Sequence, residues 1–597
     1  MSDYAAPIQD MLFVLRELAG LDEITKLAGS EELSLELVEQ ILTENARFSA
    51  EVLAPLNAPG DREGSTWREG DVRTPKGFKE AYRQFVEGGW NALQFPAAFG
   101  GQDLPKIVAA PVMEMWKSAN LSFSLCPLLT GGAIEALLLC GSEAQQRTFL
   151  PKMVAGGWTG TMNLTEPQAG SDLAAVKTKA VPEGDRYRIF GQKIFITYGE
   201  HDMAENIVHL VLARTPDAPE GVRGISLFIV PKFLVNPDGS LGQRNDVRCV
   251  SIEHKLGIHA SPTAVLAYGD KDGAIGYLVG EENRGLQYMF IMMNAARFAV
   301  GMEGVALCER AYQKALAFAK ERIQSREVGG SGSRAVPIIR HPDVRRMLMG
   351  MKAHAEATRA LAYFVAGALD RAHLGPDKEA RERNQALVDL LIPVVKGWST
   401  ETAIEVASLG IQVHGGMGFI EETGAAQYLR DARITTIYEG TTGIQANDLI
   451  GRKIARESGI TAKAVVAEIQ ALAKALAQVP DESFRAIASR LAAGAIAVGE
   501  SVDWIVATFP NDVRAVHAGA VPFLKLMGIV CGGWQMGRTA AAARKHLDEG
   551  SGNAAFLEAK IATARFFADH VLSQAPGLRE AIVQGAPGVL ALAENQF

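Results

Sequence analysis

The sequence has 597 residues, of which 48% are apolar and 21% are charged. This length is too great for one compact core, so we expect three or four domains. The formal net charge of −8 offers no general attraction to nucleic acid or to an anionic membrane. No run of eighteen or more consecutive apolar residues predicts a membrane span.

Two further features restrict the class of protein. The first residues include acidic positions where a signal peptide would carry basic charge, which predicts a cytoplasmic protein. The cysteines lie far apart and at no metal-ligand spacing, so we expect reduced thiols and no metal site. They are Cys126, Cys140, Cys249, Cys308 and Cys531.

The first two predicted domains differ in periodicity. Residues 1–158 place apolar residues three or four apart, as in KGFKEAYRQFVEGGWNAL, which predicts an α-helical domain with a short N-terminal extension. Residues 159–281 consist of short segments rich in Val, Ile, Phe and Tyr, separated by Gly, Pro, Asp and Asn. Since no helical pattern intervenes, we expect an antiparallel β domain and not a parallel nucleotide-binding sheet.

Helical patterns return in the second half. Residues 282–458 predict a bundle, in which Gly301 and Gly304 permit close contact between helices. Residues 459–597 are rich in alanine and predict a further helical domain. This last part contains twelve basic and twelve acidic residues, so it presents no basic region to a nucleic acid.

Three short motifs each have an ordinary structural interpretation beside a functional one. TEPQAGSDL (165–173) predicts a capped turn, or a rigid loop that offers hydroxyls and N–H groups to a polar heterocycle. KIFITYG (193–199) predicts a strand with Phe195 and Thr197 on one face, either packed in a core or facing a flat ring. QVHGGMGF (412–419) predicts a helix end, or backbone brought close to a phosphate or ring.

Two charged residues stand in apolar surroundings. Arg297 alone would be interpreted as a surface residue that extends its charge to solvent. Glu439 lies in a turn flanked by Ile437, Tyr438 and Ile444, so the turn should be largely buried. A buried carboxylate without a cationic neighbour in the sequence has a raised pKa, which suits a general base working near neutral pH.

Taken in order, TEPQAGSD, KIFIT, ARFAVG, QVHGGMGF and IYEGTTGIQ resemble the acyl-CoA dehydrogenase family of flavoproteins. The resemblance covers roughly residues 70–455. It implies a mainly α, multidomain fold with an N-terminal α domain, a middle antiparallel β domain and a C-terminal four-helix bundle. FAD would lie between the β domain and the bundle, and residues 459–597 would be an additional helical domain.

The resemblance also implies roles for individual residues. Glu439 would be the catalytic base, because Ala296 occupies the position where some relatives carry the base instead. Substrate contacts would come from Ser171, Arg297, Tyr438 and Gly440. Cofactor contacts would come from Met162, Leu164, Thr165, Phe195, Thr197, Arg322, Gln324, Gln412, Gly416 and Thr441.

Some of these positions carry further implications. Arg322, Gln324, Gln412 and Gly416 match segments that reach the FAD of a neighbouring subunit, so a homodimer or larger assembly is implied. Phe195 stands where many members have Trp, and Gly443 replaces a frequent Gln. Asn294 stands where a common member has an Asp that contacts the CoA part.

The family chemistry implies that Glu439 removes the α-proton of an acyl-CoA while the β-hydride passes to flavin N5, giving the trans-2-enoyl-CoA. Electrons would then pass to electron-transferring flavoprotein. The long form resembles a bacterial branch that acts on 3-methylthiopropanoyl-CoA in dimethylsulfoniopropionate degradation, so a short or methylthio-substituted substrate is expected. Two alternatives remain: an acyl-CoA oxidase that uses O₂, and a DNA-associated flavoprotein of the same fold with little turnover.

Overall fold

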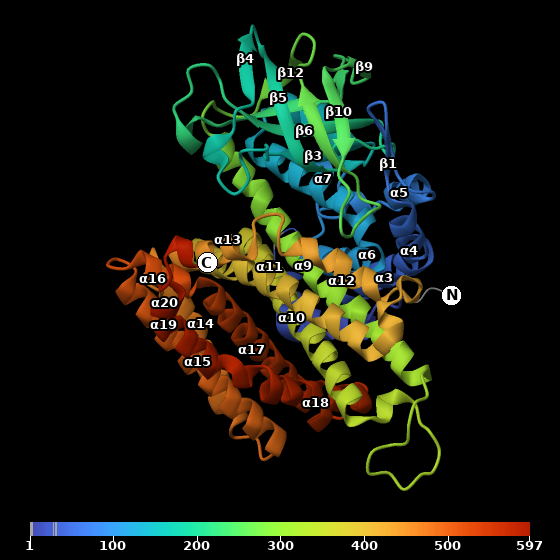
Figure 1. Cartoon of the computed structure of the whole chain (residues 1–597), viewed down its shortest axis with the longest axis vertical. Coiled ribbons are helices and arrows are strands. Elements are labelled where there is room, and N and C mark those ends of the chain that lie inside the picture. Colours follow the sequence, from blue (N-terminus) through green and yellow to red (C-terminus); the bar gives the residue numbers. More distant parts are fainter. Residues whose placement is uncertain (1–3, 28, 30–32) are drawn as a thin grey trace.

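The computed structural model describes residues 4–27, 29 and 33–597. Figure 1 shows three layers: the β domain at one end, the long helices of the bundle in the middle, and the C-terminal helices packed along one side of the bundle. The predicted fold class, three domains plus an added helical domain, is confirmed.

The N-terminal domain is helical, with one β-hairpin that the sequence analysis missed. Glu69 and Gly70 form the two-residue turn of this hairpin, and both have positive φ, of 53° and 97°. Such a turn matches the twist of the flanking strands, which explains two short strands within a helical region. The elements are α1 (Ile8–Val14), α2 (Leu21–Ile24), α3 (Leu35–Phe48), α4 (Ala54–Glu63), β1 (Thr66–Arg68), β2 (Asp71–Arg73), α5 (Phe78–Glu87), α6 (Lys106–Ala119), α7 (Leu121–Cys140) and α8 (Glu143–Val154).

The middle domain contains an eight-stranded sheet in the order β10-β11-β5-β12-β7-β6-β3, with β4 also paired to β5. All its pairs are antiparallel except β3 with β6. A parallel pair needs a long connection, and here the chain passes through β4 and β5 before it returns. The strands are β3 (Trp158–Asn163), β4 (Lys179–Glu183), β5 (Arg186–Thr197), β6 (Asn206–Ala213), β7 (Ser226–Pro231), β8 (Phe233–Val235), β9 (Leu241–Arg244), β10 (Val247–Ile252), β11 (Thr263–Tyr268) and β12 (Ala274–Leu278).

A β-bulge interrupts β5 at Phe195. Opposite β11, Lys193 pairs with Leu266 and Ile196 pairs with Ala264, so β5 has one extra residue. Phe195 takes up this residue with a φ of 60°. The bulge breaks the strict alternation between Lys193 and Ile196, but Phe195 and Thr197 both lie outside the core on either side of buried Ile196.

The bundle consists of long helices that approach closely at glycines. A Cβ on Gly301 would lie 2.6 Å from Val395 Cγ1, and one on Gly304 would lie 2.5 Å from Ser399 C. These glycines let α9 and α11 touch along their backbones, as the sequence predicts. The elements are α9 (Gly285–Glu321), α10 (Pro342–Leu374), α11 (Lys378–His414), α12 (Ala425–Thr435) and α13 (Thr442–Asp448).

The C-terminal domain packs on α10 and α11 mainly through α17. Trp398 of α11 fits against two glycines of α17: a Cβ on Gly528 would lie 2.2 Å from its Cγ, and one on Gly532 would lie 2.4 Å from its Cη2. The helices are α14 (Ile460–Leu476), α15 (Glu482–Thr508), α16 (Val513–Ala518), α17 (Ala520–Asp548), α18 (Ala554–His570), α19 (Ala575–Gln584) and α20 (Ala586–Val589).

A buried charge cluster joins the N-terminal extension to the bundle and the C-terminal domain. Arg359 of α10 binds Asp10 at 2.7 Å, Glu114 at 2.6 Å and Glu309 at 2.7 Å. Lys560 of α18 pairs with the same Asp10 and, at 2.9 Å, with Glu356. Breaking one partner of such a network leaves uncompensated buried charge, so the cluster fixes how these segments meet.

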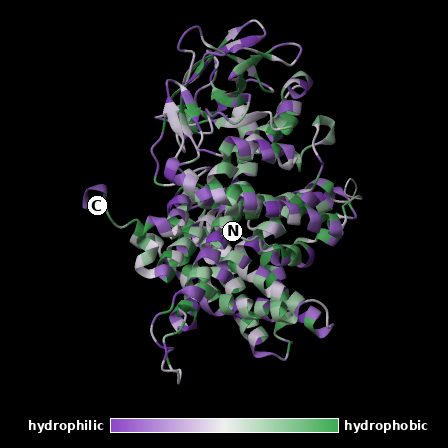
Figure 2. Cartoon of the chain, turned by 90° about the vertical axis from the view of Figure 1, so that its right-hand side faces the viewer, coloured by the Kyte–Doolittle hydropathy of each residue, from purple (hydrophilic) through white to green (hydrophobic). Residues whose placement is uncertain are grey.

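Three described helices are long and apolar enough to cross a membrane by length and composition alone: α7, α9 and α15. Of their most apolar windows, 67%, 72% and 44% respectively are buried within the protein. In Figure 2, green apolar residues alternate with purple hydrophilic ones along the helices of the lower part of the molecule. Packing against other helices accounts for the apolar composition of α7 and α9.

Candidate active site

Glu439 lies in a tight turn, residues 436–441, between α12 and α13. Its φ is 53°, and that of Gly440 is 87°. A left-handed conformation costs a residue other than glycine about 1–3 kcal/mol and persists where the surroundings enforce it. Here Gln445 Nε2 donates to the carbonyls of Glu439 and Gly440, both at 3.2 Å, and Lys396 Nζ donates to the Gly440 carbonyl at 2.7 Å.

The surroundings of Glu439 favour its protonated form. Burial raises the pKa of this carboxyl to about 7, Lys396 and Arg297 oppose the rise, and the charge of Glu303 adds to it. The side chain is only half-buried, so it remains accessible. A carboxyl with a pKa near 7 can accept a proton at neutral pH and return it.

The backbone N–H of Glu439 points to a second role for the turn. Among the described residues it donates to no carbonyl or side chain, whereas the N–H groups of Ile437 and Tyr438 bond to the Ile434 carbonyl at 2.8 and 3.1 Å. A fixed N–H donor beside a base can hydrogen-bond an oxygen on which negative charge develops. A proton-accepting carboxylate and an N–H donor could therefore come from one residue.

Charged residues that the sequence analysis missed surround this turn. Glu303 of α9 accepts a hydrogen bond from Tyr438 Oη and pairs with Lys117 of α6, whose Nζ lies 3.2 Å away. Lys396 of α11 is fully buried. The available signal was a charge inside an apolar run: Glu303 in AVGMEGVA and Lys396 in LIPVVKGW.

Arg297 lies beneath the turn and not at the surface. It is 4% exposed and pairs with Asp448 of α13, with Nη1 2.9 Å from Oδ2. Within the part of the chain that the structure describes, its Nε is buried without a hydrogen-bond partner. The isolated-residue interpretation, a charge extended to solvent, is wrong for Arg297.

Several of the predicted cofactor residues lie together where the loop that follows β3 packs beside β5. The Ile194 N–H donates to the Thr165 carbonyl at 2.9 Å, which holds the loop beside the bulge. Phe195 is 59% exposed there. Neither the Thr165 nor the Thr197 hydroxyl has a hydrogen-bond partner among the described residues. An exposed aromatic face beside two available hydroxyls fits a flat, polar ring such as a flavin.

The remaining residues of this group have different settings. Met162 is buried in β3, Leu164 is half-buried, and Ser171 is exposed in the loop that follows. Thr441 caps α13, its Oγ1 accepting from the Ile444 N–H at 3.2 Å.

The four residues expected to reach a neighbouring subunit lie elsewhere. Arg322, Gln324, Gln412 and Gly416 are exposed near the C-terminal ends of α9 and α11, which meet through the stacked rings of Phe318 and His414. Figure 1 shows the loop after α9 at the end of the bundle opposite the sheet. They are therefore not brought together with Phe195 within one chain.

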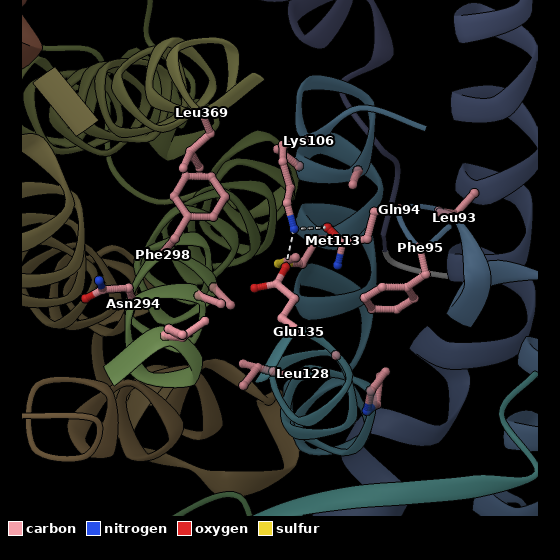
Figure 3. A pocket seen from close by; sticks show the side chains of 18 of the residues that line it. Leu93, Gln94, Phe95, Lys106, Met113, Leu128, Glu135, Asn294, Phe298 and Leu369 are labelled. Atoms are coloured by element: carbon pink, nitrogen blue, oxygen red, sulfur yellow. Dashed lines mark hydrogen bonds and ion pairs between the residues drawn. The ribbon is translucent and has the colours of Figure 1, made fainter. Parts of the chain in front are cut away.

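A cavity of about 430 Å³ lies between α6, α7 and α9 (Figure 3). Its walls are largely apolar, and its size suits a small-molecule ligand. Lys106 projects into it, where its Nζ bonds Gln94 Oε1 at 2.9 Å and pairs with Glu135. Lys117, which pairs with Glu303, also lines it, so the cavity extends to the charges near the Glu439 turn. Asn294 lies in its wall.

No group of three or more potential metal ligands occurs among the described residues. All five cysteines are free thiols.

The chain matches four family domains along its length. They are described as the N-terminal domain (36–157), the middle domain (161–270) and the C-terminal domain (283–454) of acyl-CoA dehydrogenase, and as acetyl-CoA dehydrogenase C-terminal like (465–593).

Individual relatives extend the match over nearly the whole chain. It is 55% identical to 3-methylmercaptopropionyl-CoA dehydrogenase of Ruegeria pomeroyi, covering 95% of this chain and 96% of that one. It is 35% identical to a butyryl-CoA dehydrogenase of Syntrophomonas wolfei, covering 100% and 99%. The structure resembles Caenorhabditis elegans ACDH-11 in complex with C11-CoA, with a TM-score of 0.78 at 20% identity, covering 98% and 96%.

Proposed function

The chain belongs to the acyl-CoA dehydrogenase family and is an FAD-dependent enzyme that dehydrogenates acyl-CoA thioesters, and from this premise we propose that its substrate is short, with 3-methylthiopropanoyl-CoA the first candidate. The substrate proposal rests on the 55% identity, over almost the full length of both chains, to 3-methylmercaptopropionyl-CoA dehydrogenase. Short linear acyl groups are the second candidate, on the likeness to butyryl-CoA dehydrogenase.

In this proposal Glu439 is the catalytic base. Its carboxylate takes the α-proton of the thioester, so the α-C–H bond breaks and a carboxyl O–H forms. Its backbone N–H donates to the thioester carbonyl oxygen, where negative charge develops, a contribution of roughly 3–4 kcal/mol per donor in other enzymes. Glu439 has a positive φ of 53°, and its N–H and carboxylate would both face the thioester, with Gly440 beside them.

FAD, when bound, would supply the acceptor for the hydride that leaves the β-carbon. Phe195, Thr165 and Thr197 would hold its ring system, with Met162, Leu164 and Thr441 as further contacts. Arg297 would position the turn through Asp448, and Tyr438, Gly440 and Ser171 would contact the substrate.

A homodimer completes this arrangement. Arg322, Gln324, Gln412 and Gly416 would reach the FAD of the partner. The support is a group of exposed apolar residues beside them: Ile323, Met417, Phe419 and Ile420, which are 57%, 48%, 87% and 46% exposed. Exposed apolar side chains gathered in one region mark an interaction surface. Light scattering of the holoenzyme tests the dimer, and a monomer that retains FAD would contradict it.

Electrons would leave to electron-transferring flavoprotein in the cytoplasm. The competing oxidase would form peroxide in air without any added acceptor. Turnover that depends on electron-transferring flavoprotein, with little peroxide, supports the dehydrogenase. Peroxide formed in proportion to product would replace the proposal by the oxidase.

The substrate proposal is tested by flavin bleaching under anaerobic conditions. Purified acyl-CoAs from C3 to C16 and 3-methylthiopropanoyl-CoA are compared by kcat/KM. We expect the optimum at 3-methylthiopropanoyl-CoA or a short linear chain. Because a methylthio group differs little in shape from a short alkyl extension, discrimination between these two should be only about 1–3 kcal/mol. An optimum above C8 would overturn the proposal.

A further inference from the structure

Lys396 is buried in the middle of α11, and no described residue forms an ion pair with it. Its side chain has 0% exposure, and its Nζ donates to the Gly440 carbonyl at 2.7 Å. Among the described residues no carboxylate lies within 4.0 Å of it. A buried ammonium is costly unless it is compensated, so its place beneath the turn requires a reason.

Glu303 approaches the same turn from α9 with the opposite charge. It also has 0% exposure, and it accepts a hydrogen bond from Tyr438, the residue before the base. Lys117 holds its other oxygen. The turn is thus attached to a cation through the Gly440 carbonyl and to an anion through the Tyr438 hydroxyl, one on each side of Glu439.

We propose that Lys396 and Glu303 are a pair of positioning residues that hold the Glu439 turn and act on the charge of the base with opposite sign. The ammonium of Lys396 favours the Glu439 carboxylate, which is the form that takes a proton. The carboxylate of Glu303 favours protonated Glu439. This inference rests on the proposed role of Glu439 and goes beyond it by naming what sets its working pH range.

The electrostatics agree with this geometry. Burial lowers the pKa of Lys396 to about 8, against the opposing effect of Glu439 and Glu303. Burial raises the pKa of Glu303, against Lys117. The charged or titratable groups facing this part of the molecule are Lys117 on α6, Arg297 and Glu303 on α9, Lys396 and Glu401 on α11, Asp431 and Tyr438 before the base, and Asp448 on α13.

The test measures how the rate of anaerobic flavin bleaching by substrate depends on pH in two variants. Lys396→Met removes the cation at similar volume, so the apparent pKa of the acidic limb should rise by about one unit. Glu303→Gln removes the anion and should lower that pKa by a smaller amount. Lys396→Arg keeps the charge and should restore the acidic limb toward wild type, which simple loss of packing would not predict.

Controls separate this inference from a folding defect and from the proposed function. FAD content and the thermal midpoint establish that each variant is folded. Lys378→Met removes an exposed lysine at the start of the same helix and should leave the profile unchanged. If either Lys396→Met or Glu303→Gln does not fold, the other variant alone still tests the predicted direction of the pKa shift.

Shifts in the same direction, or no shift in folded holoenzyme, would overturn the inference. If Glu439→Gln bleaches at the wild-type rate, the proposed function itself fails, whatever the two variants do. If Glu439→Gln is inactive and the profiles do not move, only the pair is wrong.

Discussion

Two buried charge clusters in this molecule have opposite designs. Where the N-terminal extension meets the bundle and the C-terminal domain, Asp10 contacts two cations, Arg359 and Lys560. At the turn, Glu439 makes no ion pair within 4.0 Å among the described residues, and the Lys396 Nζ donates to the Gly440 carbonyl. Burial acts on both carboxyls in the same direction, but the pKa of Asp10 is lowered, whereas that of Glu439 rises to about 7.

The two clusters show that the cost of burying a charged group can be met by a direct ion pair or left partly unmet. Direct pairing fixes a charge permanently, which suits an interface between segments. Withholding the direct partner leaves a proton affinity near neutral pH, which suits a group that gains and loses a proton in each turnover. The two carboxyl groups differ in the distance to the nearest opposite charge.

The largest effect is expected when the proposed base is removed. Glu439→Gln should bind FAD and substrate but lose about 10²- to 10⁴-fold in the rate of flavin bleaching, the usual contribution of a positioned general base. Stopped-flow absorbance of the holoenzyme measures it. Glu422→Gln, an exposed glutamate that precedes α12, is the matched control and should bleach normally. A normal rate in Glu439→Gln would falsify the assignment.

Breaking the charge cluster around Arg359 should lower the stability of the fold and leave the catalytic rate unchanged. Arg359→Met leaves Glu114, Glu309 and Asp10 without their shared partner, so we expect a loss of about 3–5 kcal/mol in the free energy of unfolding. The urea midpoint measures this, and kcat under stable conditions should stay near wild type. A loss of activity at unchanged stability would contradict the contrast between the clusters.

The wild-type pH profile sharpens the comparison without mutation. In the proposed mechanism only ionised Glu439 takes a proton, so kcat/KM should fall about tenfold per pH unit below pH 7 and level off above it. Stability should follow a different range. The pKa of Asp10 is depressed from its unfolded value of 3.8, so its contribution is complete above that value and is lost as the pH falls through the folded pKa.

Acid unfolding, followed by circular dichroism, measures how the stability of the fold falls with pH. We expect the activity to fall near neutrality while the fold persists to much lower pH. If both fall together near pH 7, the two clusters do not differ as described.

The smallest effect concerns the conformation of the turn. A Cβ on Gly440 would lie 2.8 Å from Gln445 Nε2, and its φ of 87° is unfavourable for alanine. Gly440→Ala should therefore cost about 1–2 kcal/mol of stability and slow bleaching, since the carbonyl bound by Lys396 must shift. Gly588→Ala has open space around its Cβ and serves as the control. Equal behaviour of the two variants would argue against a strained catalytic turn.

Much of the fold could be predicted from the sequence, because helices and strands have different periods. The bundle, the glycine contacts between α9 and α11, and the position of Glu439 in a turn all follow from local patterns. The parallel pairing of β3 with β6 and the bulge at Phe195 do not, since they depend on which strands meet.

The charges behind the base were missed for a related reason. Lys396 and Glu303 are far from Glu439 in the chain, and only the packing of α9 and α11 against the turn brings them there. A charge in an apolar run signals that something compensates it, but the sequence does not identify what. Glu439 has no cationic neighbour in the sequence, but in the fold the charges of Lys396 and Arg297 act on it.

The contact of α11 with the C-terminal domain has a consequence for engineering. Lys396 faces the catalytic turn, while Gly397 and Trp398, its next neighbours, fit against Leu524, Gly528 and Gly532 of α17. One turn of helix thus touches the reaction centre on one side and the added domain on the other. Trimming the chain at residue 458 would expose Trp398 to water and loosen the segment that holds Lys396. The long form of this enzyme is therefore not a short enzyme with a removable appendage.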